Sequence, residues 1–124
     1  MKIKDLDPPR QFSVGITDVK LTHAANIFLA NDEMITFVSD ENTEYDVVKK
    51  NWGYYATPSL GGRLLRFRLR AALMRNIDTR HCFVILVYED KLDLLEDYMK
   101  KERQEIVMWL DNYKELAHFF PLSK

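Results

Sequence analysis

The residues best suited to chemistry in this sequence lie between positions 52 and 63. Trp52 and Tyr54 offer flat aromatic faces that can cover a sugar or a base. A loop rich in hydroxyls and glycines follows, and its notable members are Thr57, Ser59, Gly61, Gly62 and Arg63. Glycine permits the concave backbone in which N–H groups converge on an anion, and a guanidinium forks onto phosphate or carboxylate. We therefore predict an anion-binding site here. The alternative is a plain hairpin loop whose aromatic neighbours belong to the core.

Two well-known phosphate-binding signatures are absent from this loop. The sequence has neither the G-x-x-x-x-G-K-[ST] pattern nor the G-x-G-x-x-G pattern. The predicted site is thus no P-loop and no dinucleotide-binding fingerprint, and it depends on the hydroxyls, the glycines and the arginine alone.

Other catalytic or metal-binding arrangements are weak. His23, His81 and His118 are far apart, and His81 and Cys82 would point to opposite faces of a strand, so neither a metal nor another cofactor is expected. Cys82 begins an apolar strand, which predicts a buried and unreactive thiol. The acids in residues 40–46 are expected to form a solvated turn. These observations favour a protein that is not an enzyme.

Charge is segregated along a chain whose net charge is only −1. Residues 31–46 are acidic and residues 49–80 are basic, with Arg66, Arg68 and Arg70 on one face of an expected strand. Charge runs usually solvate a surface. We expect these arginines to pair with acids from residues 31–46 or 89–97 and not to bind nucleic acid.

Length and composition predict a single domain over residues 1–124. Residues 1–10 are expected to be loosely ordered up to Pro8 and Pro9. No apolar run approaches the roughly 20 residues of a membrane span, no secretory signal is visible, and a single cysteine excludes an internal disulfide. A cytoplasmic location, without a membrane partner, is therefore expected.

Alternating apolar residues predict most of the chain to be strands. In residues 19–29, one face of the expected strand carries Val19, Leu21, His23, Ala25, Ile27 and Leu29. A turn at Asn31-Asp32 should pair this strand with residues 33–39 as a hairpin. Further strands are expected at residues 45–56, 64–74 and 81–88. The last of these is apolar on both faces, which is typical of a central strand.

The C-terminal third predicts helix packing onto the sheet. Residues 89–104 should form an amphipathic helix, and a strand at 105–110 should complete a right-handed parallel unit. A short helix at 112–120 should bury Leu116, Phe119 and Phe120. The predicted fold is α+β, with a mostly antiparallel sheet of about six to seven strands, one main helix and a short C-terminal helix. The expected core comprises Leu65, Phe67, Leu69, Phe83, Ile85, Val87, Leu95 and Met99.

Three segments also carry a family resemblance: YDVVKKNWGYYATPSLGGRLLRF, FVILVYEDKLDLLEDYM and EIVMWLD. Over about residues 18–111 the chain resembles small uncharacterised bacterial proteins associated with surface-polysaccharide and sugar-modification gene clusters. The resemblance implies a cytoplasmic accessory role near nucleotide-sugar chemistry. It carries no established catalytic residues.

The expected function is the binding of a small anionic ligand, such as a sugar nucleotide, or of a protein partner, with a homodimer among the arrangements considered. One alternative is a small sugar-nucleotide-processing enzyme using residues 40–46 and 57–63. Another is a structural subunit. A pocket at the predicted site would favour binding, a carboxylate beside it would favour the enzyme, and a flat apolar patch would favour assembly.

Overall fold

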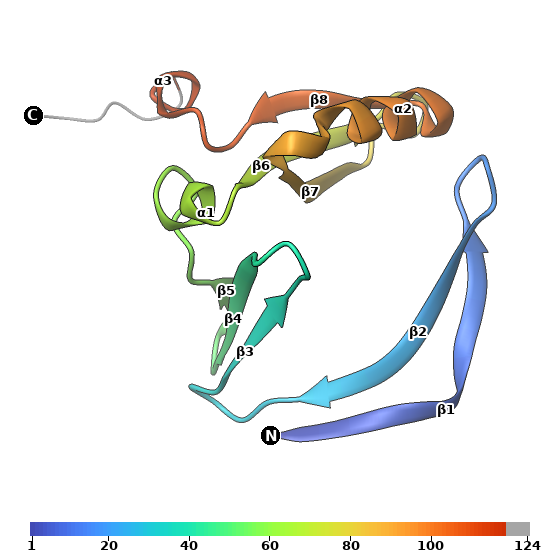
Figure 1. Cartoon of the computed structure of the whole chain (residues 1–124), viewed down its shortest axis with the longest axis vertical. Coiled ribbons are helices and arrows are strands. Elements are labelled where there is room, and N and C mark those ends of the chain that lie inside the picture. Colours follow the sequence, from blue (N-terminus) through green and yellow to red (C-terminus); the bar gives the residue numbers. More distant parts are fainter. Residues whose placement is uncertain (119–124) are drawn as a thin grey trace, which may run out of the picture. The chain divides into compact units, whose positions relative to one another are not determined.

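Eight β-strands in three small sheets dominate the part of the chain that the structure describes (Figure 1). The computed structural model describes residues 1–118, without the side chains of Tyr113 and Glu115. Strand makes up 52% of the structure and helix 17%. The predicted α+β fold on one antiparallel sheet of about six to seven strands is therefore wrong, since the fold is mostly antiparallel β with one helix longer than a single turn among the described residues.

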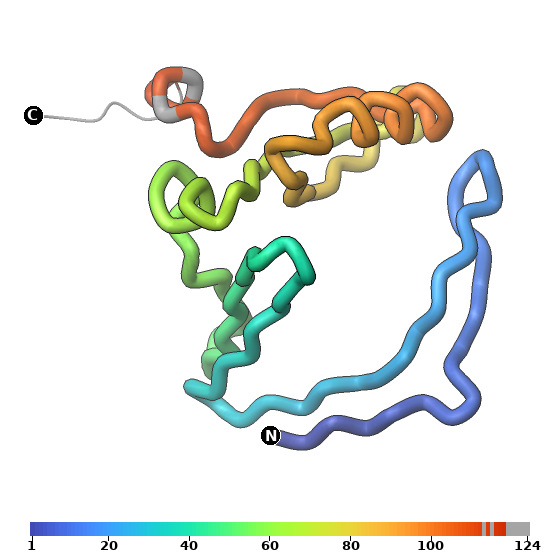
Figure 2. Tube along the Cα trace, in the orientation of Figure 1, coloured from blue at the N-terminus to red at the C-terminus, as the bar shows by residue number. Residues whose placement is uncertain are grey.

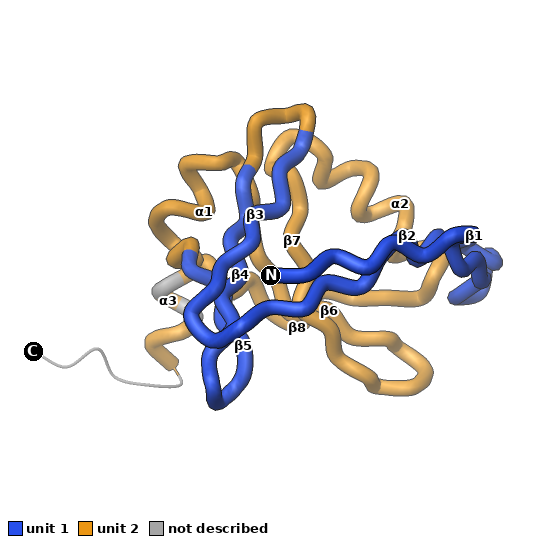
Figure 3. Tube along the Cα trace, turned by 90° about the horizontal axis from the view of Figure 1, so that it is seen from below, with its two compact units in different colours: residues 1–39, 44–57 blue, residues 40–43, 58–124 orange. Residues whose placement is uncertain are grey.

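The chain divides into two units, which we describe separately (Figure 3). Unit 1 comprises residues 1–39 and 44–57, and unit 2 comprises residues 40–43 and 58–124. The expectation of a single domain over residues 1–124 stays a prediction.

Unit 1 begins with a long antiparallel hairpin of β1 (Lys2–Val14) and β2 (Val19–Phe28) (Figure 2). Residues 1–10, expected to be loosely ordered, thus belong mostly to a paired strand. Pairing stops at Asp5 and resumes at Arg10. Pro8 and Pro9 lie in this interruption, where the amide hydrogens that proline lacks are not needed by the ladder. The register of the β1–β2 ladder therefore shifts at the segment that contains the two prolines.

The two faces of the β1–β2 hairpin differ in polarity. The predicted face of β2 is confirmed, because Leu21 pairs with Phe12 and Ile27 pairs with Ile3 on the same side of the ladder. Lys4, paired with Asn26, belongs to the opposite, polar side. Ile3 and Ile27 remain 55% and 43% exposed. The period-2 alternation thus predicted which residues share a face of the hairpin. The apolar face is nevertheless largely exposed.

The second sheet of unit 1 has the order β3-β4-β5. Its strands are β3 (Met34–Val38), β4 (Glu44–Lys50) and β5 (Gly53–Ala56). The predicted hairpin across Asn31-Asp32 is wrong, because β3 pairs with β4 instead of β2. Backbone hydrogen bonds from Asp32 N to Lys49 O and from Lys49 N to Glu33 O extend that pairing (2.7 and 3.0 Å). Residues 45–56, expected to form one strand, fold back at Asn51 and Trp52.

Unit 2 starts with α1 (Arg63–Arg66), a single helical turn where the sequence predicted a strand from residue 64. The expected alternation of Leu65 and Phe67 against Arg66 and Arg68 is therefore wrong. Arg68 has a positive φ of 60°, and β6 (Leu69–Asn76) begins directly after it. A short segment of alternating apolar and polar residues can form a helical turn as well as a strand. The local pattern alone therefore does not distinguish the two.

The sheet of unit 2 has the order β7-β6-β8, with β7 (Cys82–Tyr88) and β8 (Gln104–Trp109) both antiparallel to β6. β7 and β8 consequently run parallel to each other, as predicted for a strand–helix–strand unit, but β6 lies between them. β7 was expected to be central and is an edge strand. Cys82, at its first residue, is exposed, so the expected burial is wrong, while the low reactivity of the thiol stays a prediction.

The main helix is confirmed as η1 (Glu89–Lys91) followed by α2 (Leu92–Glu102), which packs against β7 and β8 (Figure 1). An ion pair between Asp97 and Lys101 (2.9 Å) follows the i,i+4 spacing. Arg103 ends the helix in the left-handed conformation. At the C-terminus, α3 (Tyr113–Leu116) forms a short helix, whereas Phe119 and Phe120, predicted for the core, lie outside the described residues.

Most of the buried apolar residues lie on β6. Those described are Val48 in unit 1 and Leu64, Leu69, Ala71, Ala72, Met74 and Val87 in unit 2. Of the predicted core, Leu69 and Val87 are confirmed, while Leu65 and Phe83 are 37% and 48% exposed. Leu64, which the expected strand placed on the arginine face, has no exposed surface.

Leu64→Ala should lower the free energy of unfolding by about 2–5 kcal/mol, because it removes a fully buried side chain. The matched variant Leu65→Ala, one residue along the same turn, should cost less than about 1 kcal/mol. Urea unfolding followed by circular dichroism measures both. Equal losses, or a larger loss for Leu65→Ala, would contradict the burial of Leu64.

Candidate functional site

The residues of the predicted anion site fall into both units (Figure 3). Trp52, Tyr54 and Thr57 belong to unit 1. Ser59, Gly61, Gly62 and Arg63 belong to unit 2. The structure therefore describes two local environments, each with its own partners, and the composite site stays a prediction.

The aromatic residues of unit 1 lie on its surface. Trp52, in the turn between β4 and β5, is 67% exposed and stacks on Tyr55 with ring centroids 5.9 Å apart. Tyr54 is 65% exposed, and the Nζ atom of Lys49 lies 6.0 Å from its ring centroid. These rings are not core residues, so the alternative interpretation of the aromatic cluster is wrong.

The Thr57 hydroxyl is engaged by a buried carboxylate. It donates to Asp46 Oδ2 (3.2 Å), while Thr36 Oγ1 donates to Asp46 Oδ1 (2.6 Å). Asp46 is 2% exposed and lies on β4 two residues from the buried Val48. Hydroxyl donors on both oxygens offset the cost of burying this charge. The sequence placed Asp46 in a solvated turn, although its period-2 spacing from Val48 could have indicated burial.

Ser59 and Gly62 make the turn that starts α1. The backbone N–H of Arg63 donates to Ser59 Oγ (3.1 Å), and the N–H of Leu64 donates to Ser59 O (3.1 Å). A Cβ atom on Gly62 would lie 2.5 Å from Ser59 Oγ, so a larger residue at position 62 would displace this hydroxyl. Gly61 lies between them in sequence. The Arg63 guanidinium carbon lies 5.7 Å from the Phe67 ring centroid. The Ser59 hydroxyl thus accepts the N–H of the first residue of α1.

Gly62→Ala should destabilise the protein by about 1 kcal/mol, because the new methyl group displaces Ser59 Oγ from the Arg63 N–H. In a Ser59→Ala background the same change should cost much less. The nearest remaining atom is then Ser59 Cβ at 3.7 Å, an ordinary contact. Urea unfolding of the four proteins gives the coupling energy, and simple additivity would contradict this geometry.

A cavity lined mainly by polar residues lies wholly in unit 2. It measures about 340 Å³ and is lined by Leu65, Arg70, Asp111, Asn112 and Lys114. Leu65 comes from α1 and Arg70 from β6. Asp111 and Asn112 lie in the segment that joins β8 to α3, and Lys114 lies on α3 itself. Another cavity, of about 290 Å³, lies between α2 and the start of β8, beside Met99 and Gln104.

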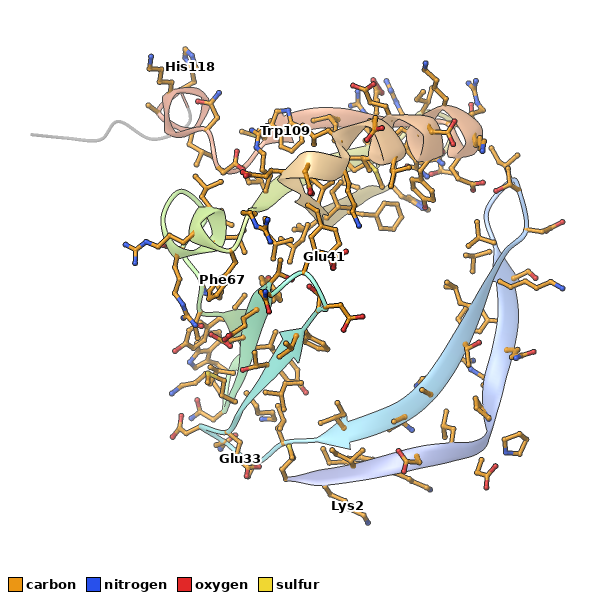
Figure 4. The ribbon with its side chains drawn as sticks, viewed as in Figure 1. Lys2, Glu33, Glu41, Phe67, Trp109 and His118 are labelled. Atoms are coloured by element: carbon orange, nitrogen blue, oxygen red, sulfur yellow. The ribbon has the colours of Figure 1, made fainter. Side chains whose placement is uncertain are left out.

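Arg70 is held rigidly at the polar cavity. Its Nε and Nη2 atoms donate to Asp111 Oδ2 and Oδ1 (3.1 and 3.0 Å), which forms a bidentate ion pair. Its guanidinium carbon lies 3.8 Å from the ring centroid of Trp109, which Figure 4 shows on β8. The Asp111 side chain is 3% exposed and also accepts the N–H of Ala71 (3.3 Å). A planar cation is therefore fixed between a carboxylate and an aromatic ring.

The expected arginine ladder does not lie on one strand. Arg66 ends α1, Arg68 precedes β6, and Arg70 lies on β6. Arg68 Nη2 donates to the backbone oxygen of Glu41 (2.7 Å), whereas Arg70 pairs with Asp111 outside both predicted acidic segments. Arg70 therefore forms a structural ion pair, as expected, but its partner Asp111 lies outside the two predicted acidic segments.

The described groups whose pKa departs from its ordinary value do not line the cavity, and most of them form ion pairs. A hydrogen bond from Arg103 lowers the pKa of Asp78, and a hydrogen bond to Glu41 raises the pKa of Lys91. Burial raises the pKa of Tyr45 on β4. Asp78 contributes stability above its ordinary pKa, and this contribution is lost as the pH falls through its lowered value. Exposed pairs of this kind are screened by solvent and contribute little.

No cluster of potential metal ligands occurs in the described part of the chain. No described helix is long and apolar enough to cross a membrane. The sequence missed Asp111 and Trp109 as partners of Arg70, because they lie about forty residues away in the chain. The sequence signal that could have indicated this site is the position of Asp111, a carboxylate that directly follows the apolar strand predicted at residues 105–110.

No protein-family model matches the chain, and neither does any curated protein or solved structure. The resemblance to bacterial sugar-modification proteins therefore stays a prediction.

Proposed function

We propose that the protein binds a small ligand carrying a phosphate or a carboxylate in the cavity beside Arg70 and Lys114. The observation that carries this proposal is the fixed guanidinium at a cavity of about 340 Å³. A cation held in place before the ligand arrives loses little conformational freedom on binding. Sugar phosphates and sugar nucleotides are ligands of this class.

Arg70 has donors to spare for an anion. Asp111 accepts from Nε and Nη2, which leaves the Nη1 edge of the guanidinium for a second acceptor. The Arg70 side chain is 30% exposed, so a ligand can approach it from solvent. The ion pair therefore orients Arg70 without consuming its capacity to bind phosphate or carboxylate.

Lys114 supplies the second charge. It lines the same cavity, so two cations face one carboxylate, and an anion would meet a net positive charge there. Asn112 Oδ1 accepts the Lys114 N–H (3.1 Å), which fixes the start of α3 near the cavity. Leu65 adds an apolar wall for the uncharged part of the ligand.

Binding is favoured over catalysis at this cavity. Both oxygens of Asp111 already accept hydrogen bonds from Arg70, and Oδ2 also accepts one from the backbone. A general base needs an oxygen within reach of the proton it removes. The volume is at the small end of ligand pockets, so we propose that the cavity holds the anionic end of the ligand.

Lys114→Ala should weaken binding of a sugar 1-phosphate by about tenfold or more, because a charge-assisted hydrogen bond contributes roughly 1.5–3 kcal/mol. Lys101→Ala on α2 removes the same charge outside the cavity lining and should leave the affinity unchanged. Isothermal titration calorimetry with inorganic phosphate, a sugar 1-phosphate and a sugar nucleotide measures the affinities, and the neutral sugar serves as the ligand control.

The predicted loop provides the competing location. If Arg63→Ala weakens binding and Lys114→Ala does not, the ligand lies at residues 57–63 and the cavity proposal is wrong. An equal effect of Lys101→Ala and Lys114→Ala would indicate only general attraction of anions. If none of the anions binds at millimolar concentration, a role in protein binding or assembly becomes the better interpretation.

A further inference from the structure

The outer edge of β7 has none of the features that usually protect an edge strand. Its sequence, CFVILVY, contains no charge, proline or glycine, and its pairing with β6 is regular. An unprotected edge presents unpaired N–H and C=O groups that pair readily with another strand. In the sheet order β7-β6-β8 this edge has no neighbouring strand among residues 1–118.

β8, the opposite edge of the same sheet, provides a contrast. Its pairing with β6 is interrupted opposite Leu73 and Met74, which leaves Val107 as an extra residue, and Glu105 adds a charge. Bulges and charges are the usual devices against edge pairing. One edge of the sheet is therefore protected and the other is not.

The backbone of β7 has a defined set of outward groups. The N–H of Asn76 donates to His81 O and the N–H of Glu89 donates to Arg68 O (both 2.9 Å), so odd-numbered residues bond inward to β6. The alternation of an antiparallel ladder then directs the N–H and C=O groups of Cys82, Val84, Leu86 and Tyr88 outward. Val84 and Phe83 are 66% and 48% exposed, on opposite faces.

We propose that β7 pairs antiparallel with β7 of a second copy of this chain, centred on Ile85. A two-fold axis through this point places Ile85 opposite Ile85 of the second copy, as a pair without mutual hydrogen bonds. Val84 and Leu86 then exchange backbone hydrogen bonds between copies, which uses the outward groups. Apolar side chains face one another along the whole ladder.

Charge at the ends of β7 supports the second copy as the occupant. Residues at equal distances from Ile85 come together in this register. His81 of one copy then lies near Glu89 of the other, and Arg80 lies near Asp90. The exposed basic end thus meets the exposed acidic end twice in each dimer. The two sheets become one continuous antiparallel sheet with β8 at both edges.

Val84→Lys tests the interface. It places an unpaired ammonium opposite Leu86 of the second copy, and the exposure of Val84 allows the monomer to accept the change. The dissociation constant of the dimer should rise at least about tenfold. The matched control Val107→Lys makes the same change on β8, where Val107 is 43% exposed, and should leave the dimer intact. Sedimentation equilibrium measures association, and circular dichroism verifies folding.

A cysteine pair tests the register. In a Cys82→Ser background, Ile85→Cys should give a disulfide-linked dimer with oxidised glutathione, because the two introduced thiols meet on the two-fold axis. Phe83→Cys, in the same background, faces Val87 of the second copy and should remain largely unlinked, although Phe83 is the more exposed residue. Non-reducing gel electrophoresis separates the products.

Three results would overturn the proposal. They are a wild-type chain that stays monomeric at every concentration, a Val84→Lys protein that dimerises as tightly as the wild type, and cross-linking through Phe83→Cys that matches or exceeds that through Ile85→Cys. Loss of the dimer in Val107→Lys alone would move the interface to β8 and also contradict it.

Discussion

Two-sided pairing of β6 is the interaction on which unit 2 depends. β6 bonds to β7 on one side and to β8 on the other, and it carries Leu69, Ala71, Ala72 and Met74, most of the buried apolar residues described. Its first residues also bring Arg70 to the segment after β8, where Asp111 and Trp109 hold the guanidinium. The cavity, the edge strand and the helix that follows it are all positioned by this one strand.

The parts of the fold that the sequence predicted are those decided by local periodicity. The helix that includes Leu92 and Leu95, and the face of β2 that includes Leu21 and Ile27, follow from patterns long enough to exclude the alternative period. Leu65 and Phe67 show the limit of prediction from periodicity. A pattern only four or five residues long fits a strand and a single helical turn equally well. The predicted pairing of β2 with β3 failed for another reason. Which strands pair is decided by distant partners, and a turn sequence such as Asn31-Asp32 does not specify them.

The candidate site shows the same division between local and distant information. Residue types at 57–63 were consistent with anion binding, yet Thr57 and Ser59 hydrogen-bond Asp46 and the start of α1. Hydroxyls and glycines meet the needs of a turn before those of a ligand. The cavity at Arg70 was not predictable in this way, since Asp111 and Lys114 reach it only through the pairing of β6 with β8. The apolar sequence of β7 predicted a central strand with both faces buried. Because β7 lies instead at the edge of its sheet, we propose that it pairs with β7 of a second copy of the chain.

The placement of the two tryptophans gives each unit its own optical reporter. Trp52 lies in the exposed turn between β4 and β5, stacked on Tyr55, whereas Trp109 lies under the Arg70 guanidinium. Intrinsic fluorescence excited in the tryptophan band therefore contains one contribution from unit 1 and one from unit 2. A soluble quencher reaches the first ring more readily, and replacing Trp52 by phenylalanine isolates the second. The emission of Trp109 then follows the environment of Arg70 directly, without any added label.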